Sequence, residues 1–312
     1  MYDVIIVGGG PAGATAGKYL AMAGKKVLLL QKNFSFKKPC GGGLRIDAFD
    51  EFSIDREQIE YVVSEIVIES KKSILKYDIS QSPLAIVNRM HFDQSLRTDA
   101  VRAGVTLLEE KVKEVSCTDF GVEVEAVGEA GKKKYKGVYL IAADGVHSYV
   151  RKVMRKEAVP AHMTHYCDIL SLETKSCHFY FGTDLSKGSY GWRFPYGEGS
   201  DIGVVDSMNH KKNISSLFDL LNLEHTQKIH GYKIPVWESP LFYDKRIFYV
   251  GDAAGQVLPF TYEGIYYAMK SAKILATVIA EDLHPEVYEE RWNAVQEEIF
   301  HTLTFGKTLF TF

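Results

Sequence analysis

The stretch PCGGGL at residues 39 to 44 places the thiol of Cys40 directly before three glycines. A thiol can donate a proton, exchange electrons, or line a wall as a small, soft side chain. The glycines leave the backbone that follows without Cβ atoms. The other three cysteines are scattered, with no CxxC pair and no histidines at metal-ligand spacing. The sequence therefore indicates no metal site and no disulfide framework, and it leaves the three roles of Cys40 open.

A second group of glycines has the spacing Gly8-x-Gly10-x-x-Gly13. It stands between an apolar strand expected at 4–7 and an alanine-rich helical stretch, and an apolar strand at 27–30 completes the strand–helix–strand unit. Gly8 permits the tight turn, Gly10 lets a pyrophosphate approach the backbone, and Gly13 permits close packing of the helix. The amino end of the helix offers free N–H groups to an anion. The pattern predicts a dinucleotide site.

Four more residues belong to this predicted site. Pro11 and Ala12 lie inside the glycine motif, and Gln31 and Lys32 follow the second strand, where an acidic residue usually binds a ribose. The amide of Gln31 can bond a hydroxyl, but without the strength of a charged partner. Lys32 suggests a 2′-phosphate instead.

Two further strands are expected to end in an aspartate beside a glycine. The strand at 137–143 leads into Asp144-Gly145, and the strand at 246–250 leads into Gly251-Asp252. Such pairs can simply make turns. At the carboxyl ends of parallel strands they would instead line one long ligand.

Together, and in this order, the three motifs resemble those of the FAD-binding family that includes p-hydroxybenzoate hydroxylase and geranylgeranyl reductase. The similarity runs from residue 1 to about residue 285. It implies FAD as the cofactor, with Asp252 at its ribityl or pyrophosphate part. Asp144 and Gly145 would then support it near the pyrophosphate.

The run NRMHFDQSL at 88–96 matches the family's Arg-x-x-Phe-Asp-x-x-Leu pattern. The resemblance makes Arg89 an FAD contact. We expect Asp93 to cap the amino end of the following helix.

In the geranylgeranyl reductases, a Cys-Gly-Gly run resembling PCGGGL passes beside the isoalloxazine ring. The resemblance places Cys40, Gly41 and Gly42 at the flavin, where a planar ring needs backbone without Cβ atoms. It assigns Gly43 to the substrate and sets the cation of Arg45 against the FAD phosphates.

The segment YGWRFPYGEGSDIGVV at 190–205 carries alternating aromatic residues. In a strand, Tyr190, Trp192 and Phe194 project from one face, and we expect Pro195 to end the pairing. Such a stripe is often ordinary sheet core. Its spacing also resembles the Tyr-x-Trp-x-Phe-Pro motif with which geranylgeranyl reductases line a lipid tunnel, and a related aromatic-proline motif marks flavin halogenases. Gly203 matches the first glycine of the Gly-x-Gly that follows.

Val205 stands where that motif has its second glycine, so we expect a narrower tunnel end. Another family pattern, Pro-x-x-Gly-x-Gly-Ile, matches at Pro259, Gly264 and Ile265, with Tyr262 in place of its first glycine. In the family this turn brings a helix amino terminus toward the flavin. Tyr262 would either crowd the flavin or cap the substrate pocket.

The fold class follows from these motifs and from segments with period-two patterning, such as EIVIES and GVEVEAV. We predict an α/β fold in which a Rossmann-type FAD-binding domain is interleaved with an antiparallel β-sheet substrate domain, as in p-hydroxybenzoate hydroxylase. The expected boundaries are an FAD-binding domain at 1–64, 88–159 and 236–285, a substrate-binding sheet at 65–87 and 160–235, and a C-terminal helical tail at 286–312.

The charge balance excludes one class of function. The 312 residues include 37 Lys plus Arg and 40 Asp plus Glu, a formal net charge of -3, which gives no electrostatic support for nucleic-acid binding. No base–nucleophile constellation emerges around the ten histidines, which argues against a hydrolase.

By the resemblance, the preferred function is an FAD-dependent reductase that saturates C=C bonds of a polyprenyl lipid of geranylgeranyl type, or of its precursor. Reduced flavin would deliver a hydride, and Cys40, Tyr262 or water would supply the proton. Catalysis would rest on holding the alkene in a dry apolar slot. The electron donor stays open between NAD(P)H and ferredoxin, so a redox partner protein is a further expectation.

Two alternatives share the same motifs. A flavin-dependent monooxygenase of an aromatic compound would use the same cofactor site. A non-catalytic flavoprotein that binds a quinone or lipid and passes electrons is left open by the departures at Gln31, Val205 and Tyr262.

The location follows from hydropathy. The amino end has no basic region, and no window reaches about 18 apolar residues. We expect a cytoplasmic protein, with peripheral contact at the inner face of a membrane as an alternative. The aromatic tail predicts either an amphipathic helix over the substrate sheet or a shallow membrane anchor; its aromatic residues are Trp292, Phe300, Phe305, Phe310 and Phe312.

Overall fold

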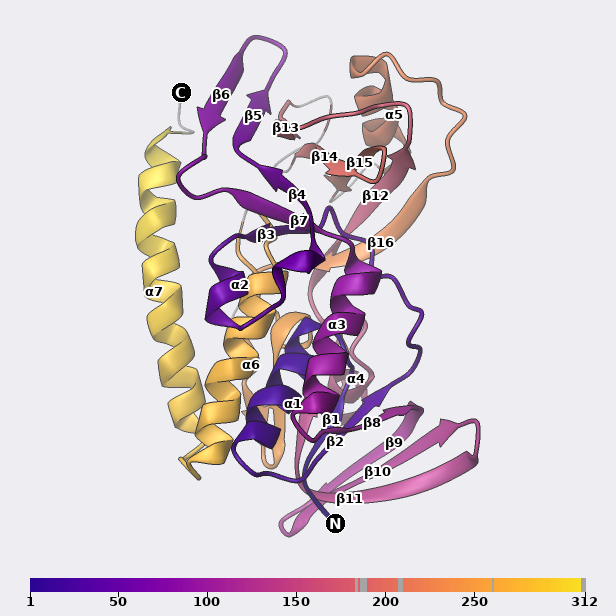
Figure 1. Ribbon diagram of the computed structural model, residues 1–312, viewed down its shortest axis with the longest axis vertical. Coiled ribbons are helices and arrows are strands. Elements are labelled where there is room, and N and C mark those ends of the chain that lie inside the picture. The colour runs from indigo at the N-terminus through magenta and orange to yellow at the C-terminus, as the bar shows by residue number, and fades with distance from the viewer. Residues whose placement is uncertain (183–184, 186–189, 207–209, 239, 260, 310–312) are drawn as a thin grey trace. The chain divides into compact units, whose positions relative to one another are not determined.

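The computed structural model describes residues 1–182, 185, 190–206, 210–238, 240–259 and 261–309 (Figure 1). The chain forms two compact units. Unit 1 comprises Met1–Phe34, Leu96–Val159 and Trp237–Phe312, and unit 2 comprises Ser35–Ser95 and Pro160–Val236.

Unit 1 is built on the predicted strand–helix–strand element. Strand β1 (Tyr2–Val7), helix α1 (Pro11–Met22) and strand β2 (Val27–Gln31) follow one another, and the two strands pair in parallel. The parallel part of the sheet has the order β18-β11-β1-β2-β8. Its other strands are β8 (Thr106–Glu109), β11 (Gly131–Ala142) and β18 (Ile247–Tyr249), with β17 (Tyr243–Asp244) antiparallel at one edge.

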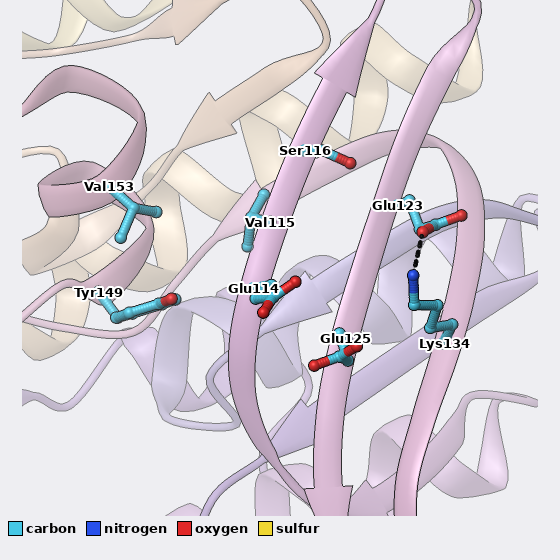
Figure 2. A pocket seen from close by; sticks show the side chains of 8 residues that line it. All are labelled: Glu114, Val115, Ser116, Glu123, Glu125, Lys134, Tyr149 and Val153. Atoms are coloured by element: carbon cyan, nitrogen blue, oxygen red, sulfur yellow. Dashed lines mark hydrogen bonds and ion pairs between the residues drawn. The ribbon is translucent and has the colours of Figure 1, made fainter.

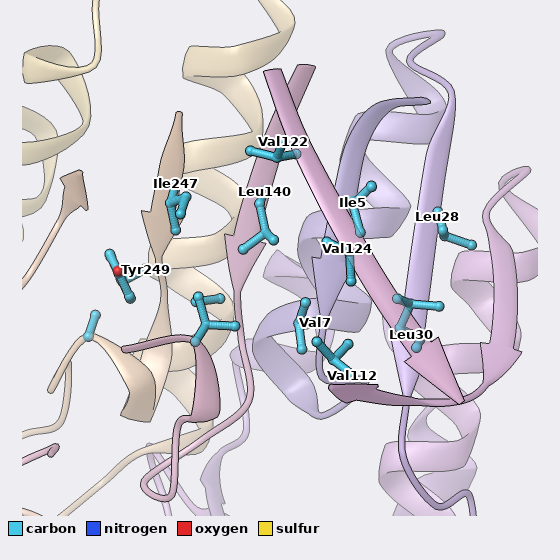
Figure 3. Packing of buried hydrophobic residues seen from close by; sticks show 14 residues of the cluster. Ile5, Val7, Leu28, Leu30, Val112, Val122, Val124, Leu140, Ile247 and Tyr249 are labelled. Carbon is cyan, nitrogen blue, oxygen red and sulfur yellow. The ribbon is translucent and has the colours of Figure 1, made fainter. Parts of the chain in front are cut away.

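The two faces of this sheet are covered differently. Strands β9 (Lys111–Thr118) and β10 (Gly121–Gly128) continue from β11 as an antiparallel meander. Figure 3 shows side chains of β9 and β10 packed on one face of the parallel strands, in a cluster that includes Ile5, Leu28 and Val124. On the other face Ile6 meets α1, since a Cβ at Gly17 would lie 3.5 Å from its Cδ1. Burial on both faces explains why these strands are almost wholly apolar.

Helix α1 packs against α6 (Ile265–Ala280), and α6 packs against α7 (Glu286–Leu309). In α7, Trp292 is 2% exposed and packs edge-on against Tyr267 at 6.3 Å between ring centroids. The part of the tail around Trp292 therefore packs within unit 1, whereas the sequence predicted either a cover for the substrate sheet or a shallow membrane anchor. Phe310 and Phe312 lie outside the described residues, as do the side chains of Phe300 and Phe305.

No helix in the described ranges combines the length and apolarity needed to cross a bilayer.

Unit 2 contains a seven-stranded sheet in the order β16-β12-β15-β14-β13-β5-β6, antiparallel except for the β13–β5 pair. Helix α5 (His210–Leu220) packs on one face through Leu217 and Phe218, in a core with Ile202 and Val204. The strands are β5 (Glu65–Glu69), β6 (Ile74–Asp78), β12 (Ala161–Ile169), β13 (Cys177–Tyr180), β14 (Gly191–Tyr196), β15 (Gly199–Asp206) and β16 (His230–Pro235).

A second, three-stranded sheet in unit 2 has the order β3-β7-β4. Its strands are β3 (Gly43–Arg45), β4 (Ile59–Val63) and β7 (Leu84–Val87). Residues 84–87 were expected in the substrate sheet, but β7 pairs with β3 and β4 instead. For the same reason residues 35–64 cluster with unit 2, although we expected them in the FAD-binding domain.

The remaining helical segments are short, apart from α3. They are α2 (Ala48–Glu51), the 3-10 turn η1 (Arg56–Gln58), α3 (Arg89–Arg102), α4 (Tyr149–Arg155) and the 3-10 turn η2 (Gly251–Ala253).

Candidate functional site

The loop between β1 and α1 has the geometry of an anion site. Gly8 has φ +103°, and a Cβ there would lie 2.3 Å from the carbonyl oxygen of Ala143. A Cβ at Gly13 would lie 1.9 Å from the oxygen of Gly8, so neither position accepts a side chain. Nothing lies within 4 Å of a Cβ at Gly10, and Gly10 caps α1 without a side-chain hydrogen bond. The amino end of α1 therefore presents open backbone that suits a pyrophosphate.

Two side chains hold Gly9 from opposite sides. The Oε1 atom of Gln31 accepts a hydrogen bond from Gly9 N at 2.8 Å. Arg97 donates from Nη1 to the oxygen of Gly9 at 3.1 Å and from Nη2 to the oxygen of Phe34 at 3.0 Å. Gln31 is 9% exposed and also donates to the oxygen of Asn33, so its amide is used within the protein rather than held out toward a ribose. Lys32 beside it is exposed.

The three strand-end motifs lie along one edge of the unit 1 sheet. Strands β18, β11 and β1 are neighbours and parallel, so their carboxyl ends share that edge. A Cβ at Gly8 would lie 2.8 Å from Cα of Asp144, and one at Gly251 would lie 3.2 Å from Cβ of Ala12. These contacts place all three motifs at one edge, as a single long ligand requires.

Asp144 organises the start of α4. Its carboxylate accepts hydrogen bonds from Ser148 Oγ at 2.6 Å and from the backbone N–H groups of Tyr149 and Val150 at 2.7 and 3.0 Å. Burial raises the pKa of Asp144, while these hydrogen bonds act against that shift. Gly145 has φ +77°, and nothing lies within 4 Å of a Cβ there.

A buried network supports the turn that carries Asp252. Gly251 N donates to Gln256 Oε1 at 2.8 Å, and Gln256 Nε2 donates to the Tyr288 hydroxyl at 2.8 Å. That hydroxyl donates to the oxygen of Tyr249 at 2.9 Å. These hydrogen bonds hold η2 in place from within the core. No sequence motif predicted this role for Gln256.

Asp252 also lies against the start of α6. A Cβ at Gly264, the residue that caps α6, would lie 3.4 Å from Oδ1 of Asp252. Ile265 is the first residue of α6 and is buried. Asp252 is 7% exposed, so its carboxylate is buried beside the start of α6.

Tyr262 adopts the backbone conformation that favours glycine. Its φ is +55°, and its N–H donates to the oxygen of Leu258 at 3.1 Å. The turn thus keeps the geometry of the family's glycine although tyrosine stands there. Pro259 is half-buried in the same turn, and its oxygen accepts from Thr261 N at 3.0 Å.

In unit 2, Cys40 lies beside a buried ion pair. Arg89 and Asp93 form two hydrogen bonds of 3.0 Å, with side chains 3% and 7% exposed. Burial acts to lower the pKa of Arg89, but Asp93 and Cys40, which also bonds the guanidinium, raise it on balance. The prediction that Asp93 caps α3 is wrong, because α3 begins at Arg89 and Asn88 accepts the hydrogen bond from Met90 N at 3.1 Å.

The glycines after Cys40 have protein neighbours of their own. A Cβ at Gly41 would lie 2.5 Å from the ring of Phe194. Gly42 has φ +74°, and its Cβ would lie 2.4 Å from the oxygen of Val87. Gly43 pairs with Ile86 in the β3–β7 ladder.

Arg45 ends β3 with an exposed side chain that donates from Nε to Asp47 at 2.6 Å.

The predicted aromatic stripe lies on the face of the unit 2 sheet opposite α5. Phe179 makes edge contacts with Tyr190 at 5.2 Å and with Phe194 at 5.3 Å between ring centroids. Pro195 does not end the pairing, since β14 continues to Tyr196 against β15. The pairing of β14 with β13 stops at Arg193, so the β13–β14 ladder requires no N–H group at Pro195.

The indole of Trp192 lies directly over Gly203, its register partner. A Cβ at Gly203 would lie 2.4 Å from Cζ2 of Trp192, so this glycine seats the ring. Trp192 Nε1 donates to Oδ1 of Asp201 at 2.6 Å. Val205 is 1% exposed and pairs with Thr164 in β12.

A hollow of about 240 Å³ on unit 1 is a different kind of site (Figure 2). It lies over β9 and β10 beside α4, and three of its lining residues are Glu114, Glu123 and Glu125. Lys134 pairs with Glu123 at 3.2 Å. This excess of carboxylates does not suit an anionic cofactor. Within the part of the chain that the structure describes, no three His, Cys, Asp or Glu side chains gather as metal ligands.

Comparison with known proteins agrees with these motifs. Residues 1–216 match the model of a family described as "FAD binding domain". The fold is that of a geranylgeranyl bacteriochlorophyll reductase-like protein of Thermoplasma acidophilum, with a TM-score of 0.84, 24% identity, and coverage of 95% of this chain and 83% of that one. The class is therefore that of FAD-binding oxidoreductases, as the motifs predicted.

Two relatives narrow the assignment. The geranylgeranyl diphosphate reductase of Rhodobacter capsulatus is 30% identical over 297 residues, which cover 88% of this chain and 74% of that protein. The digeranylgeranylglycerophospholipid reductase of Methanocaldococcus jannaschii is 29% identical, over 94% of this chain and 82% of that protein. The chain belongs to the geranylgeranyl reductase family of FAD-dependent oxidoreductases.

Proposed function

We propose that this chain is an FAD-dependent reductase that saturates carbon–carbon double bonds of a polyprenyl lipid or of its precursor. Membership of the geranylgeranyl reductase family supports the reaction. The observation in the structure that carries the proposal is the aromatic face of unit 2, on which Trp192 is held by Asp201 and Phe194 packs on the Cys40-Gly41 segment.

The residues of unit 1 fit FAD. The bare backbone at Gly10 and the open amino end of α1 would hold the pyrophosphate, and Asp252 would hold the ribityl chain. When reduced, FAD supplies the hydride that this reaction needs. Gln31 and Arg97 contribute by fixing Gly9, because a loop held in advance loses less freedom when the ligand binds.

The aromatic face of unit 2 would receive the polyprenyl chain. An isolated alkene has no carbonyl group for the protein to polarise, so positioning and exclusion of water must lower the barrier. The rings of Tyr190, Trp192 and Phe194 provide apolar surface for this purpose. The contacts of Tyr190 and Phe194 with Phe179, and the bond from Trp192 to Asp201, keep that surface in one conformation.

We further propose that Cys40 borders the flavin, as the resemblance implies. Its sulfur accepts from Gly42 N at 3.4 Å, and the Arg89 guanidinium lies beside it. Tyr262 belongs to the turn before α6, and by the resemblance it would either crowd the flavin or cap the substrate pocket. We propose NAD(P)H or ferredoxin as the electron donor. We also propose that the protein contacts a membrane peripherally, so that its lipid substrate can enter.

Product analysis tests this function. The purified protein, loaded with FAD and chemically reduced without oxygen, is incubated with geranylgeranyl diphosphate and, separately, with a prenylated glycerolipid. Mass spectrometry is expected to find products that have gained pairs of hydrogens. Trp192→Ala should lower their yield, whereas the opposite-face control Phe218→Leu should not. Unchanged lipids with the wild-type protein would refute the proposal, and oxygen insertion into an aromatic compound would support a monooxygenase instead.

A further inference from the structure

A carboxyl pair lies in the row of side chains next to the aromatic face. In the register of the unit 2 sheet, Asp201 on β15 pairs with Phe194 on β14 and with Asp168 on β12. Directly paired residues have Cβ atoms about 4.5–5.5 Å apart and point to the same face. Phe194, Asp201 and Asp168 therefore form one row across that face.

The two carboxyl groups differ in burial. Asp201 is 4% exposed, whereas the side chain of Asp168 is 42% exposed. Trp192 Nε1 donates to Oδ1 of Asp201 at 2.6 Å, and Asp168, its direct register partner, lies within reach of the same carboxyl group. Two carboxylates on directly paired residues repel each other, and a hydrogen bond between them requires one proton.

The other groups that face the pair are known. Lys37 Nζ lies 4.0 Å from Asp168 Oδ2 and 4.1 Å from the ring centroid of Tyr196, whose hydroxyl it also bonds. Tyr166 on β12 shares the face of Asp168, whereas Cys167 points to the opposite face, and both lie close enough for the charge of Asp201 to affect them. The pKa of Tyr166 and the pKa of Cys167 are both raised to about 12, mainly by burial and next by the charges of Asp201 and Asp168. Both side chains therefore stay neutral near neutral pH.

Burial raises the pKa of Asp201 to about 7, and Asp168 adds to the shift against the bond from Trp192 and the charge of Lys37. A carboxyl group with such a pKa is suited to act as a general acid near neutrality. The proposed reaction needs an acid, and the carboxyl pair is a further candidate beside Cys40 and Tyr262.

We propose that Asp201 and Asp168 share one proton and are the acid of the reduction, with Asp168 delivering the proton at the exposed side of the pair. This inference rests on the proposed function. A hydride from the reduced flavin adds to one alkene carbon, the π bond breaks, and the carboxyl O–H gives its proton to the other carbon. The pair is left with one more negative charge, which Lys37 faces, and water restores the proton through Asp168.

The first test observes the proton without any substrate. The indole N–H resonance of Trp192 is followed in the FAD-loaded protein labelled with 15N-tryptophan, and Trp192→Phe identifies it among the three tryptophans. Over a range from about pH 5 to about pH 9, it should titrate in the wild type, titrate at lower pH in Asp168→Asn, and stay constant in Asp201→Asn. A wild-type resonance that does not move would overturn the shared proton.

The second test measures single-turnover reduction of a polyprenyl lipid by the pre-reduced protein. Asp201→Asn and Asp168→Asn should each slow the step by roughly 100-fold or more, while the exposed control Asp78→Asn keeps the wild-type rate. Flavin absorbance checks that the variants still bind and reduce the cofactor. Wild-type rates in the two pair variants would overturn the acid role. If the wild type reduces no polyprenyl lipid but its indole titrates, the proposed function fails and the shared proton stands.

Discussion

Gln31 and Arg97 hold the two sides of one residue in the phosphate loop. Gln31 Oε1 accepts from Gly9 N at 2.8 Å, and Arg97 Nη1 donates to the oxygen of Gly9 at 3.1 Å. Both side chains are buried, at 9% and 4% exposure. The last position of β2, where an acid usually meets the ribose, here stabilises the loop itself.

Replacing Gln31 should weaken FAD binding. Gln31→Leu leaves the Gly9 N–H buried without an acceptor, which costs about 1–3 kcal/mol. If half of this appears in binding, the Kd for FAD rises roughly 2- to 13-fold. Titration of the apoprotein by flavin fluorescence measures this Kd. Lys136→Ala, at an exposed position of β11, is the control, and equal Kd values for the two variants would contradict the role given to Gln31.

Breaking the ion pair beside Cys40 should cost more stability than breaking an exposed pair on the same helix. Asp93→Asn leaves the buried Arg89 charge without its partner, which is expected to cost about 3–5 kcal/mol. Asp99→Asn weakens a pair to Arg102, whose side chain is 76% exposed, and a 4.0 Å pair to Lys18, and should cost about 0–1 kcal/mol. Urea unfolding of both variants gives the free energies. Similar losses would show that burial of the Arg89 pair has no energetic consequence.

A methyl group at Gly203 should displace the Trp192 ring. Its Cβ would lie 2.4 Å from Cζ2 of Trp192, so Gly203→Ala should destabilise the fold by about 1–3 kcal/mol and shift the indole N–H resonance. Gly231→Ala on β16 of the same sheet is the matched control, because its nearest neighbours lie 3.7 Å away. An unshifted indole resonance in Gly203→Ala would mean that the ring is seated elsewhere.

Tyr262 should carry backbone strain that glycine relieves. A non-glycine residue in the left-handed region costs about 1–2 kcal/mol, and Tyr262 has φ +55°. Tyr262→Gly should therefore be more stable than Tyr262→Ala by about 1 kcal/mol, since both variants lose the ring and differ only in backbone preference. Thermal or urea unfolding of the pair decides this, and an alanine variant at least as stable as glycine would rule the strain out.

The pH dependence of stability should change when Asp201 is replaced. The pKa of Asp201 in the folded state, about 7, lies above the ordinary aspartate value of 3.8, so the folded state binds more protons than the unfolded state between those values. The contribution of Asp201 is therefore fully present at low pH and declines as the pH rises toward 7. The free energy of unfolding of the wild type minus that of Asp201→Asn should fall across this window in urea titrations. A difference that stays constant with pH would contradict the raised pKa.

The cofactor motifs were predictable because local sequence determines them. A strand that is apolar on both faces, a glycine turn and a small-residue helix can each be recognised from consecutive residues. The parallel order of β18, β11 and β1 then brings Asp144 and Asp252 to the edge of the sheet that holds Gly8. The family resemblance extended this to FAD.

The sequence could not predict partners distant in the chain. The bond from Gly9 N to Gln31 joins residues 22 positions apart, so the sequence motif alone predicts a ribose contact for Gln31. The bond from Arg97 to Gly9 joins residues 88 positions apart, so no local pattern indicates it. Asp93 was assigned to a helix cap because Asn88, one residue before the helix, was overlooked as the capping side chain. Asp201 escaped notice because its burial depends on the pairing of three strands.

The proposal that reduced flavin saturates a polyprenyl double bond is tested most directly by measuring flavin oxidation and hydrogen addition to the lipid in one experiment. The FAD-loaded protein is reduced by one equivalent without oxygen, mixed with geranylgeranyl diphosphate, and followed by flavin absorbance while the lipid is analysed by mass spectrometry. If the protein is a polyprenyl reductase, each flavin that is reoxidised should yield one reduced double bond. A fully saturated analogue should leave the flavin reduced. Flavin that stays reduced with the unsaturated lipid, or that reoxidises without adding hydrogens to it, would contradict the assignment.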